Sequence, residues 1–426
     1  MLAQLAAIIW TITQPIPAVI PDVLAVRGLL TAFQVVAIFA VLVLLWRTIL
    51  FGRYRALPGA SDDELPTVTV IVPAYNEGPQ VLTTIQSIMF SDYPHAKLSV
   101  IAIDDGSLDD TWTWIQRGAA AFPDHVIALR CPMNRGKREA LYEGFNRATG
   151  DVIVTVDSDS ELHDDALRNL VTPLVREPRV GAVAGNVRVL NRSQGAIPTM
   201  VDVVFTSSFE FIRVTQSEVG AVMCCPGALS AYRRELVDVF KDEWVTQTFL
   251  GAPASIGEDR AMTNAVLRLD REVRFQANAI VVTKVPTDTA QLARTFLRWA
   301  RSDVRETLSL TQLLISRLRA SDLGTWINVV SSALAMLLAP LALISVVGLA
   351  VVDPGTLIWI AAALVLTSVF PAVLYAHLRE PRHAWWAFGY AAYNLLCLSW
   401  IQPYALLTPA HSQWLTRSLP VARQRT

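Results

Sequence analysis

Charged residues are scarce in this sequence, and its few cysteines form no pattern. Asp, Glu, Lys and Arg make up 17% of the 426 residues, whereas a soluble domain has about 25%. The 36 basic residues nearly cancel the 37 acidic ones, so the chain lacks the positive charge typical of nucleic-acid-binding proteins. The four cysteines have neither metal-site spacing nor a disulfide framework. We therefore expect reduced thiols and no nucleic-acid partner.

The charges are missing mainly from the two ends of the chain. Residues 1–51 carry three charged side chains and residues 319–426 carry nine. Residues 28–46 are uncharged and long enough to cross a bilayer core of about 30 Å, so they predict a transmembrane helix. Residues 2–21 are also uncharged, but prolines in their second half would interrupt a helix. No basic residue precedes Arg27, and we therefore expect no cleaved signal peptide.

Three further uncharged runs, at residues 324–352, 355–376 and 384–408, predict a C-terminal membrane region. If all three cross, the C-terminus lies outside; if Pro340 or Pro403 marks a broken or re-entrant segment, the number of crossings changes. Both alternatives stay open. Arginines directly after residue 46 place the charged middle of the chain in the cytoplasm by the positive-inside rule. We expect a multi-pass protein of the plasma (inner) membrane.

Residues 292–319 carry arginines at helical spacing. Arg294, Arg298, Arg301 and Arg305 form one narrow stripe, which predicts an amphipathic helix at the membrane interface. The stripe faces either the lipid surface or the catalytic site. Together these patterns divide the chain into N-terminal membrane segments (1–51), a linker (52–66), a cytosolic domain (67–290), interface helices (291–322), a C-terminal transmembrane region (323–408) and a tail (409–426).

The cytosolic domain alternates short β-rich runs with helical patterns. Buried strands are predicted at residues 68–72, 99–103, 126–129, 152–156 and 181–187, with helices near 79–91, 109–121 and 137–148. This alternation predicts a mostly parallel α/β sheet, in which ligands bind beyond the carboxyl ends of the strands. Polar clusters follow the first four strands, and they are Pro73-Ala-Tyr-Asn-Glu77, Asp104-Asp-Gly-Ser107, Asn134-Arg-Gly-Lys-Arg138 and Asp157-Ser-Asp159.

Each cluster alone also has a structural explanation. Asp-Gly-Ser is a common turn sequence, and Asn-Arg-Gly-Lys fits a turn as well. Placed along one sheet edge, the clusters favour a ligand site: Lys137 can neutralise a diphosphate, and Asp157 and Asp159 project to the same side, as Mg²⁺ or Mn²⁺ bridging a diphosphate requires. Further on, Gly257-Glu-Asp-Arg260 opens a helical pattern, and its acids fit either a helix start or a catalytic base.

These motifs, followed by Arg298-Trp299 and placed between hydrophobic ends, resemble the processive family-two glycosyltransferases, including hyaluronan synthases and nodulation-type chitin-oligosaccharide (N-acetylglucosaminyl) synthases. The likeness covers roughly residues 25–420 and extends to Val222-Met-Cys-Cys225, Tyr232-Arg-Arg234 and Ser412-Gln-Trp-Leu-Thr-Arg417. It implies a cytosolic α/β domain of the glycosyltransferase A type, Rossmann-like, with transmembrane helices at both ends and amphipathic interface helices.

The resemblance also implies a role for each matching residue. Tyr75, Glu77 and Asp105 would hold the uridine, and Lys137, Asp157 and Arg298 the nucleotide and its phosphates. Asp159 would bind Mg²⁺ or Mn²⁺, Asp259 would be the general base, and Trp299 would stack on the acceptor sugar. Trp414 and Arg417 would belong to a segment that gates the nucleotide site. The implied partners are UDP-N-acetylglucosamine, with or without UDP-glucuronic acid, the growing polysaccharide and the lipid bilayer.

The implied activity is a membrane-embedded, inverting, processive β-glycosyltransferase that polymerises and exports an N-acetylglucosamine-containing polysaccharide. Three departures from the family pattern bear on processivity and substrate choice: Thr295 replaces a Gln, Pro226-Gly-Ala-Leu229 replaces Ser-Gly-Pro-Leu, and Leu415 replaces the glycine of the gate. A non-processive membrane transferase acting on a lipid-linked acceptor therefore remains an alternative. A nucleotide-binding receptor or transporter fits less well, because it needs neither a base nor an acceptor platform.

Overall fold

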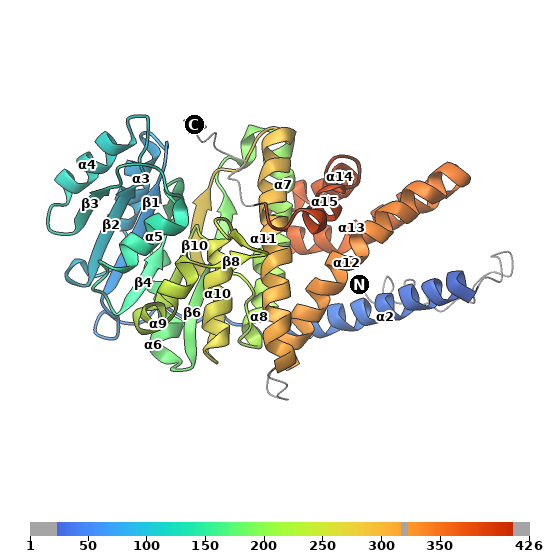
Figure 1. Ribbon diagram of the computed structural model, residues 1–426, viewed down its shortest axis with the longest axis horizontal. Helices are drawn as coiled ribbons and strands as arrows, with labels where there is room; N and C mark the ends of the chain where they lie inside the picture. Colours follow the sequence, from blue (N-terminus) through green and yellow to red (C-terminus); the bar gives the residue numbers. More distant parts are fainter. Residues whose placement is uncertain (1–23, 317–322, 412–426) are drawn as a thin grey trace.

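The computed structural model describes residues 24–316 and 323–411 (Figure 1). The apolar segment 2–21 and the predicted gate residues Trp414 and Arg417 lie outside these ranges. A sheet domain occupies one end of the molecule, on the left of Figure 1. Helices α7 (Ala196–Ser207) and α11 (Thr289–Ser316) flank it, and α2 (Leu24–Arg53), α12 (Leu323–Val352) and α13 (Thr356–Leu378) extend away on the far side.

Eight strands form the central sheet in the order β3-β2-β1-β4-β7-β6-β10-β5. Their bounds are β1 Val68–Ala74, β2 Leu98–Asp104, β3 Val126–Arg130, β4 Val152–Thr155, β5 Ser160–Leu162, β6 Val180–Val189, β7 Ser230–Arg233 and β10 Glu272–Thr283. The first four predicted strands are confirmed and pair in parallel, while β7 and β5 run antiparallel to their neighbours. The predicted α/β fold is thus a mixed sheet whose parallel part carries the polar clusters.

The sheet is buried because helices cover it. All seven residues of β1 are buried, as expected for a β-branched strand in the middle of an α/β sheet. The covering helices are α3 Gln80–Met89, α4 Thr111–Ala121, α5 Lys137–Phe145, α6 Ala166–Arg176, α9 Arg234–Val245 and α10 Glu258–Arg268. A two-stranded ribbon of β8 Thr248–Phe249 and β9 Ala252–Pro253 follows α9. The predicted helices near 79–91, 109–121 and 137–148 correspond to α3, α4 and α5.

The start of the predicted linker is fastened to the sheet just after α2 ends. The hydroxyl of Tyr54 donates a hydrogen bond to the carbonyl of Phe275 (2.9 Å) and accepts one from the amide of Ala277 (3.0 Å). The side chain of Gln276 bonds both backbone groups of Leu57, at 3.3 Å and 2.7 Å. Both contacts lie on β10, the next-to-last strand of the sheet, so the chain leaving α2 is joined directly to the sheet.

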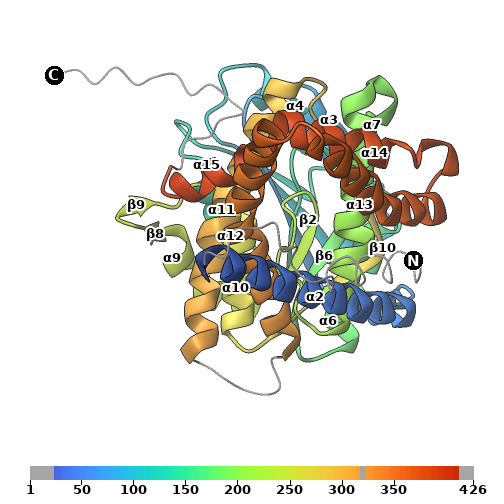
Figure 2. The ribbon, with the colours of Figure 1, turned by 90° about the vertical axis from the view of Figure 1, so that its right-hand side faces the viewer.

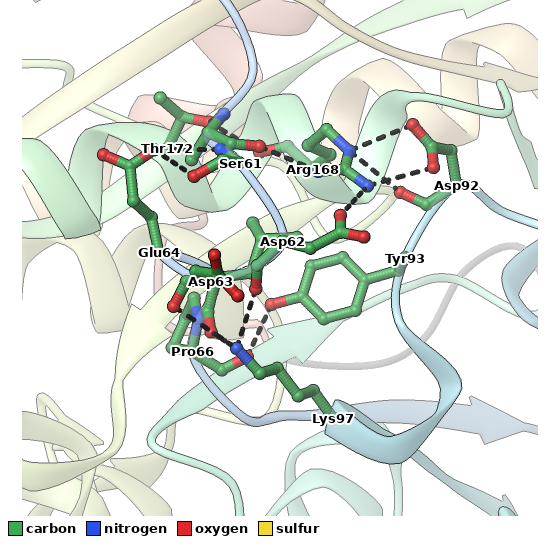
Figure 3. Close-up of polar contacts among 12 residues, drawn as sticks. Ser61, Asp62, Asp63, Glu64, Pro66, Asp92, Tyr93, Lys97, Arg168 and Thr172 are labelled. Atoms are coloured by element: carbon green, nitrogen blue, oxygen red, sulfur yellow. Dashed lines mark hydrogen bonds and ion pairs between the residues drawn. The ribbon is translucent and has the colours of Figure 1, made fainter.

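The end of the linker is held by α6 and the α3–β2 loop (Figure 3). Arg168 donates to the carbonyl of Ala60 (2.8 Å) and pairs with Asp62 (2.7 Å) and Asp92 (3.0 Å). Lys97 donates to the carbonyl of Leu65 (2.7 Å). Residues 52–66 are therefore an ordered strap on the domain surface rather than a loose connection.

The predicted interface helix is one continuous helix, α11, and it packs against the sheet domain. Two arginines of its stripe are almost fully buried: Arg301 is 4% exposed and Arg305 is 1% exposed. Arg305 bonds the carbonyl of Ile256 and pairs with Glu306, and Arg301 donates to the hydroxyl of Thr408 (3.1 Å). These two side chains face protein, whereas the sequence had suggested the lipid surface or the catalytic site; Arg298 of the same stripe lines the cavity described below.

Within the described residues, three helices are long and apolar enough to cross a membrane: Gln34–Arg53, Leu323–Val352 and Thr356–Leu378. The third C-terminal run, 384–408, is instead divided into α14 (Trp386–Tyr393), a π-helix η6 (Asn394–Leu398) and α15 (Ile401–Leu407). The backbone stays helical at Asn394, Ser399 and Trp400, and Pro403 lies inside α15, so the run is an irregular helix rather than one interrupted at that proline. Helix α14 packs on α7 and α15 packs on α11 (Figures 1 and 2), and the number of crossings stays a prediction.

Candidate active site

The polar clusters at the strand ends line a single cavity of about 1420 Å³. Because β1, β2 and β4 run in parallel, their carboxyl ends meet at one edge of the sheet. Helix α11 lines the same cavity as these strand ends. Among the described residues, the structure brings together every residue with a predicted role at this cavity, namely Tyr75, Glu77, Asp105, Lys137, Asp157, Asp159, Asp259, Arg298 and Trp299.

Asp105 shapes the loop that begins the next helix. Its carboxylate is 3% exposed and accepts hydrogen bonds from the amides of Arg135 (3.0 Å) and Gly136 (2.8 Å). Burial raises the pKa of Asp105 above its usual value, and the two amide bonds oppose this rise. The adjacent Gly106 has φ +70°, and a β-carbon there would overlap the backbone of Met133. The Asp-Gly turn therefore holds the loop that positions Lys137.

Lys137 is the centre of a charged group beneath the cavity. Its ammonium lies 2.5 Å from a carboxylate oxygen of Asp157 and 2.9 Å from one of Glu258. Burial disfavours the charge of Lys137, but the two carboxylates outweigh it and hold its pKa above the ordinary value. Burial likewise raises the pKa of Glu258, yet Lys137 and Arg298 bring it down to about 2. Lys137 and Glu258 therefore carry opposite charges at neutral pH.

Asp259 is the second residue of α10, and its pKa is shifted in the opposite direction from that of its neighbour Glu258. Removal from bulk water and the nearby negative charge of Glu258 raise the pKa of Asp259 to about 6. One of its oxygens accepts the amide of Arg260 (2.7 Å), and the thiol of Cys224 donates to the other (3.7 Å). A carboxylate with a pKa close to neutrality, facing a cavity, has the properties of a general base.

Asp159 is the residue predicted to bind a metal, and it lines the cavity. Its Oδ1 lies 3.4 Å from the hydroxyls of Ser160 and Thr283. The neighbouring Asp157 is paired with Lys137. Throughout residues 24–316 and 323–411, no three His, Cys, Asp or Glu side chains come together as a metal site. The donor set thus fits a Mg²⁺ or Mn²⁺ ion that takes one carboxylate from the protein and its other ligands from phosphates and water.

Aromatic side chains line the part of the cavity next to α11. The ring of Trp299 is 42% exposed and stacks on Phe296, with centroids 5.4 Å apart and planes 26° apart. Phe205 of α7 lies 6.3 Å away from Trp299, centroid to centroid. Thr295, which stands in the place of the family Gln, is buried and also lines the cavity. Flat, partly exposed rings of this kind suit the apolar face of a sugar.

Beyond these rings most of the cavity lining is apolar. It comes from α12 and the segment 384–408, where the apolar Ala339, Ala342, Leu343, Val346, Leu395, Leu398 and Ile401 are joined by the polar Ser332, Asn394, Ser399 and Gln402. The cavity therefore extends from the charged strand ends to α12, one of the helices that are apolar enough for a membrane.

Sequence comparison decides the class of protein. The sequence pattern of the family described as "Glycosyltransferase like family 2" matches residues 66–302. The chain belongs to this family. The glycosyltransferase is 33% identical to an N-acetylglucosaminyltransferase of Mesorhizobium japonicum, over 84% of this chain and 83% of that protein. It is 31% identical to an N-acetylglucosaminyltransferase of Rhizobium meliloti, over 91% of both chains.

Comparison with solved structures agrees with the fold. A mannosyltransferase of Pyrobaculum calidifontis, solved in complex with GDP-Man and Mn²⁺, covers 92% of this glycosyltransferase and 99% of its own chain, with a TM-score of 0.54 and 23% identity. The predicted glycosyltransferase A-type fold and the predicted enzyme class are confirmed. The roles of the individual site residues, the likeness to hyaluronan synthases and the processive reaction stay predictions.

Two residues of the site carried no predicted role. Glu258 was part of a recognised motif, but its pairing with Lys137 links positions 121 residues apart and shows only in the fold. Cys224 belongs to the Cys-Cys motif, and nothing in its spacing indicated that its thiol reaches Asp259. Two adjacent acidic residues stand at the predicted start of this helix. If both are buried, one of them needs a positively charged partner, and this could have suggested that Glu258 is paired.

Proposed function

We propose that this glycosyltransferase transfers N-acetylglucosamine from UDP-N-acetylglucosamine, with inversion, to a growing saccharide that it elongates repeatedly. The observation that carries the proposal is the single cavity that joins the charged strand ends, Asp259, the aromatic wall and the apolar helices. Relatives that are N-acetylglucosaminyltransferases support the choice of sugar. The helices with membrane-like length and the arginines at or just after the end of α2 (Arg47, Arg53 and Arg55) support a multi-pass inner-membrane protein with a cytoplasmic catalytic domain.

In the proposed reaction, Asp259 takes the proton from the attacking acceptor hydroxyl. The acceptor oxygen forms a bond to the anomeric carbon while the bond from that carbon to the diphosphate oxygen breaks. Lys137 and Arg298 stabilise the negative charge that passes to the departing UDP. A divalent cation at Asp159 supplies further positive charge to the diphosphate when bound. Attack opposite the leaving group inverts the anomeric centre, so an α-linked donor gives a β-linked product.

Donor binding in this proposal uses the strand-end residues. Tyr75, Glu77 and Asp105 hold the uridine, and Asp157 together with Lys137 binds the nucleotide and its phosphates. Trp299 presents its exposed ring to the acceptor sugar beside Asp259. The segment with Trp414 and Arg417 closes over the nucleotide.

A second candidate function is supported by one feature of the cavity. The lining contributed by Ala339, Leu343 and Leu398 is apolar, which suits the hydrocarbon part of a lipid-linked acceptor. Together with Thr295 in place of the family Gln, this favours a non-processive transferase that adds one sugar to such an acceptor. The two functions differ in the number of sugars added per binding event.

The deciding experiment uses purified enzyme in lipid nanodiscs with Mg²⁺ or Mn²⁺ and radiolabelled UDP-N-acetylglucosamine, with and without UDP-glucuronic acid. Polymer from the first donor alone indicates a chitin-type product, and a need for both donors indicates a hyaluronan-type product. A single added sugar on a lipid extract supports the second candidate. Absence of transfer from every UDP-sugar tested overturns the proposal. Activity that survives EDTA contradicts the metal part of the mechanism.

A further inference from the structure

One wall of the cavity is an unusual helical segment. Residues Ser208–Arg213 form a π-helix, η3, between α7 and α8 (Val214–Glu218). Turns of π-helix are rare and occur frequently at functional sites. The segment has two faces: Ser208, Phe209, Ile212 and Arg213 line the cavity, whereas Glu210 and Phe211 are buried behind it.

The cavity face of η3 lies beside the reacting groups. The guanidinium of Arg213 covers the ring of Phe209 at 3.8 Å, donates to the carbonyl of Cys224 (3.1 Å) and donates to the hydroxyl of Ser208 (2.8 Å). The thiol of that same Cys224 bonds Asp259. Phe209 also packs on Phe205, which lies next to Trp299. The position of η3 therefore sets the wall against which the acceptor lies.

The back face of η3 is held by helices that are long enough for a membrane. Glu210 Oε1 pairs with the guanidinium of Arg379, which directly follows α13, at 2.7 Å. The same oxygen pairs with Arg188 (3.2 Å) and accepts a hydrogen bond from the side-chain amide of Asn186 (2.9 Å). Phe211 packs edge-on against Phe370 of α13, with centroids 4.9 Å apart, and Phe51 of α2 lies 5.6 Å from it. Polar and apolar contacts thus join α13 to the segment that forms the acceptor wall.

We propose that Glu210 and Arg379 are positioning residues for the acceptor, which they place through η3 without touching it. This inference rests on the proposed function, because it assigns the η3 side of the cavity to the acceptor. The donor residues Tyr75, Asp105 and Asp157 follow β1, β2 and β4. Glu210 instead contacts Asn186 and Arg188 of β6 and Arg379, which directly follows α13. Loosening the pair therefore impairs acceptor placement and leaves donor binding unchanged.

The test compares Arg379→Met with Arg379→Lys. In the first variant Glu210 keeps Arg188 and Asn186, so the buried carboxylate remains partnered while η3 loses its link to α13. Because small displacements of reacting groups are costly, kcat for elongation falls about tenfold and products become shorter. The KM for UDP-N-acetylglucosamine stays within about twofold, since donor contacts are intact. Arg379→Lys restores much of kcat and product length.

The matched control is Arg382→Met, which removes an exposed arginine three residues along that pairs with Glu380. It should elongate like the wild type. If Arg379→Met does not fold, Phe211→Leu weakens the apolar half of the same contact and should give the same split between kcat and KM. Wild-type product lengths in both variants, or a rise in donor KM equal to the fall in kcat, overturn the inference. Inactivity of the wild type with every UDP-sugar instead overturns the proposed function.

Discussion

The hydroxyl of Ser302 occupies the space that a β-carbon of Gly257 would need. Gly257 has φ +71° and directly precedes Glu258, the first residue of α10, whereas Ser302 lies on α11. The contact brings the helix that carries Asp259 against the helix that carries Arg298 and Trp299. The distance between the proposed base and the proposed acceptor platform thus depends on the absence of one side chain.

We expect Gly257→Ala to lose most transferase activity, because the new methyl group displaces α11 from α10. Gly251→Ala is the matched control: its φ is +80°, yet no atom lies within 4 Å of the added carbon. Both variants carry the left-handed strain of about 1–2 kcal/mol. Steady-state kinetics and thermal unfolding of the two proteins separate the contact from the strain. Equal losses in both would show that the approach of Ser302 does not matter.

Asp259→Asn should lower the rate of transfer at least about 100-fold, because the proton acceptor is lost, whereas UDP should still bind. It should also raise the melting temperature at pH 8. The folded protein raises the pKa of Asp259 to about 6, so above that pH the charged carboxylate opposes folding, and the neutral amide removes this cost. Calorimetry and UDP titration measure both effects, with the exposed Asp238→Asn as the control. Near-normal turnover would refute the assignment of the base.

The pH profile should report the same carboxylate. Because the base works only when ionised, kcat/KM of the wild type falls as the pH drops through the pKa of Asp259, about 6. Glu258→Gln removes a negative charge that raises the pKa of Asp259. It also removes the ion pair between Glu258 and Lys137, so the positive charge of Lys137 stabilises the Asp259 carboxylate more strongly. In the variant, the fall of kcat/KM on the acid side of the pH profile should therefore move to lower pH. A fall at unchanged or higher pH in the variant would argue against the electrostatic coupling.

Arg168→Ala should release the end of the strap, residues 60–66 (Figure 3). The substitution removes bonds to the carbonyl of Ala60 and to Asp62 and Asp92, so a loss of roughly 1–3 kcal/mol in unfolding free energy is expected. Limited proteolysis should cut within the strap faster, with donor KM unchanged. Arg176→Ala, whose contact with Glu64 is 3.7 Å long, should have little effect. Unaltered proteolysis in Arg168→Ala would contradict this account.

The sequence was sufficient to predict one side of the site. Strands β1, β2 and β4 are apolar and β-branched, and each is followed at once by a polar cluster, so strand order and the rule for parallel sheets bring Tyr75, Asp105 and Asp157 together. The antiparallel strand β7, only Ser230–Arg233, has no comparable pattern. Glu258 could not be paired with Lys137 from the sequence, because that contact depends on how α10 docks.

For the side of the site formed by α11 and the run 384–408, sequence periodicity and hydropathy predicted helices but not what those helices pack against. The arginine stripe of α11 was visible in the spacing, but spacing does not say what a stripe faces, and Arg305 proves to be buried against Ile256. The run 384–408 is apolar enough for a membrane helix, but its apolar composition did not indicate the π-helix at Asn394–Leu398 or the packing of its two ends against α7 and α11. The roles predicted for Trp414 and Arg417 fall on residues outside the described structure.

The hydroxyl of Tyr54 uses both of its hydrogen-bonding directions on β10, and the chain is fastened again at Leu57 and Ala60. A tether held at three successive points has no slack, so the sheet domain stays fixed relative to the end of α2. In the proposed function, the acceptor must therefore enter the cavity to reach Asp259, because the domain does not move toward it.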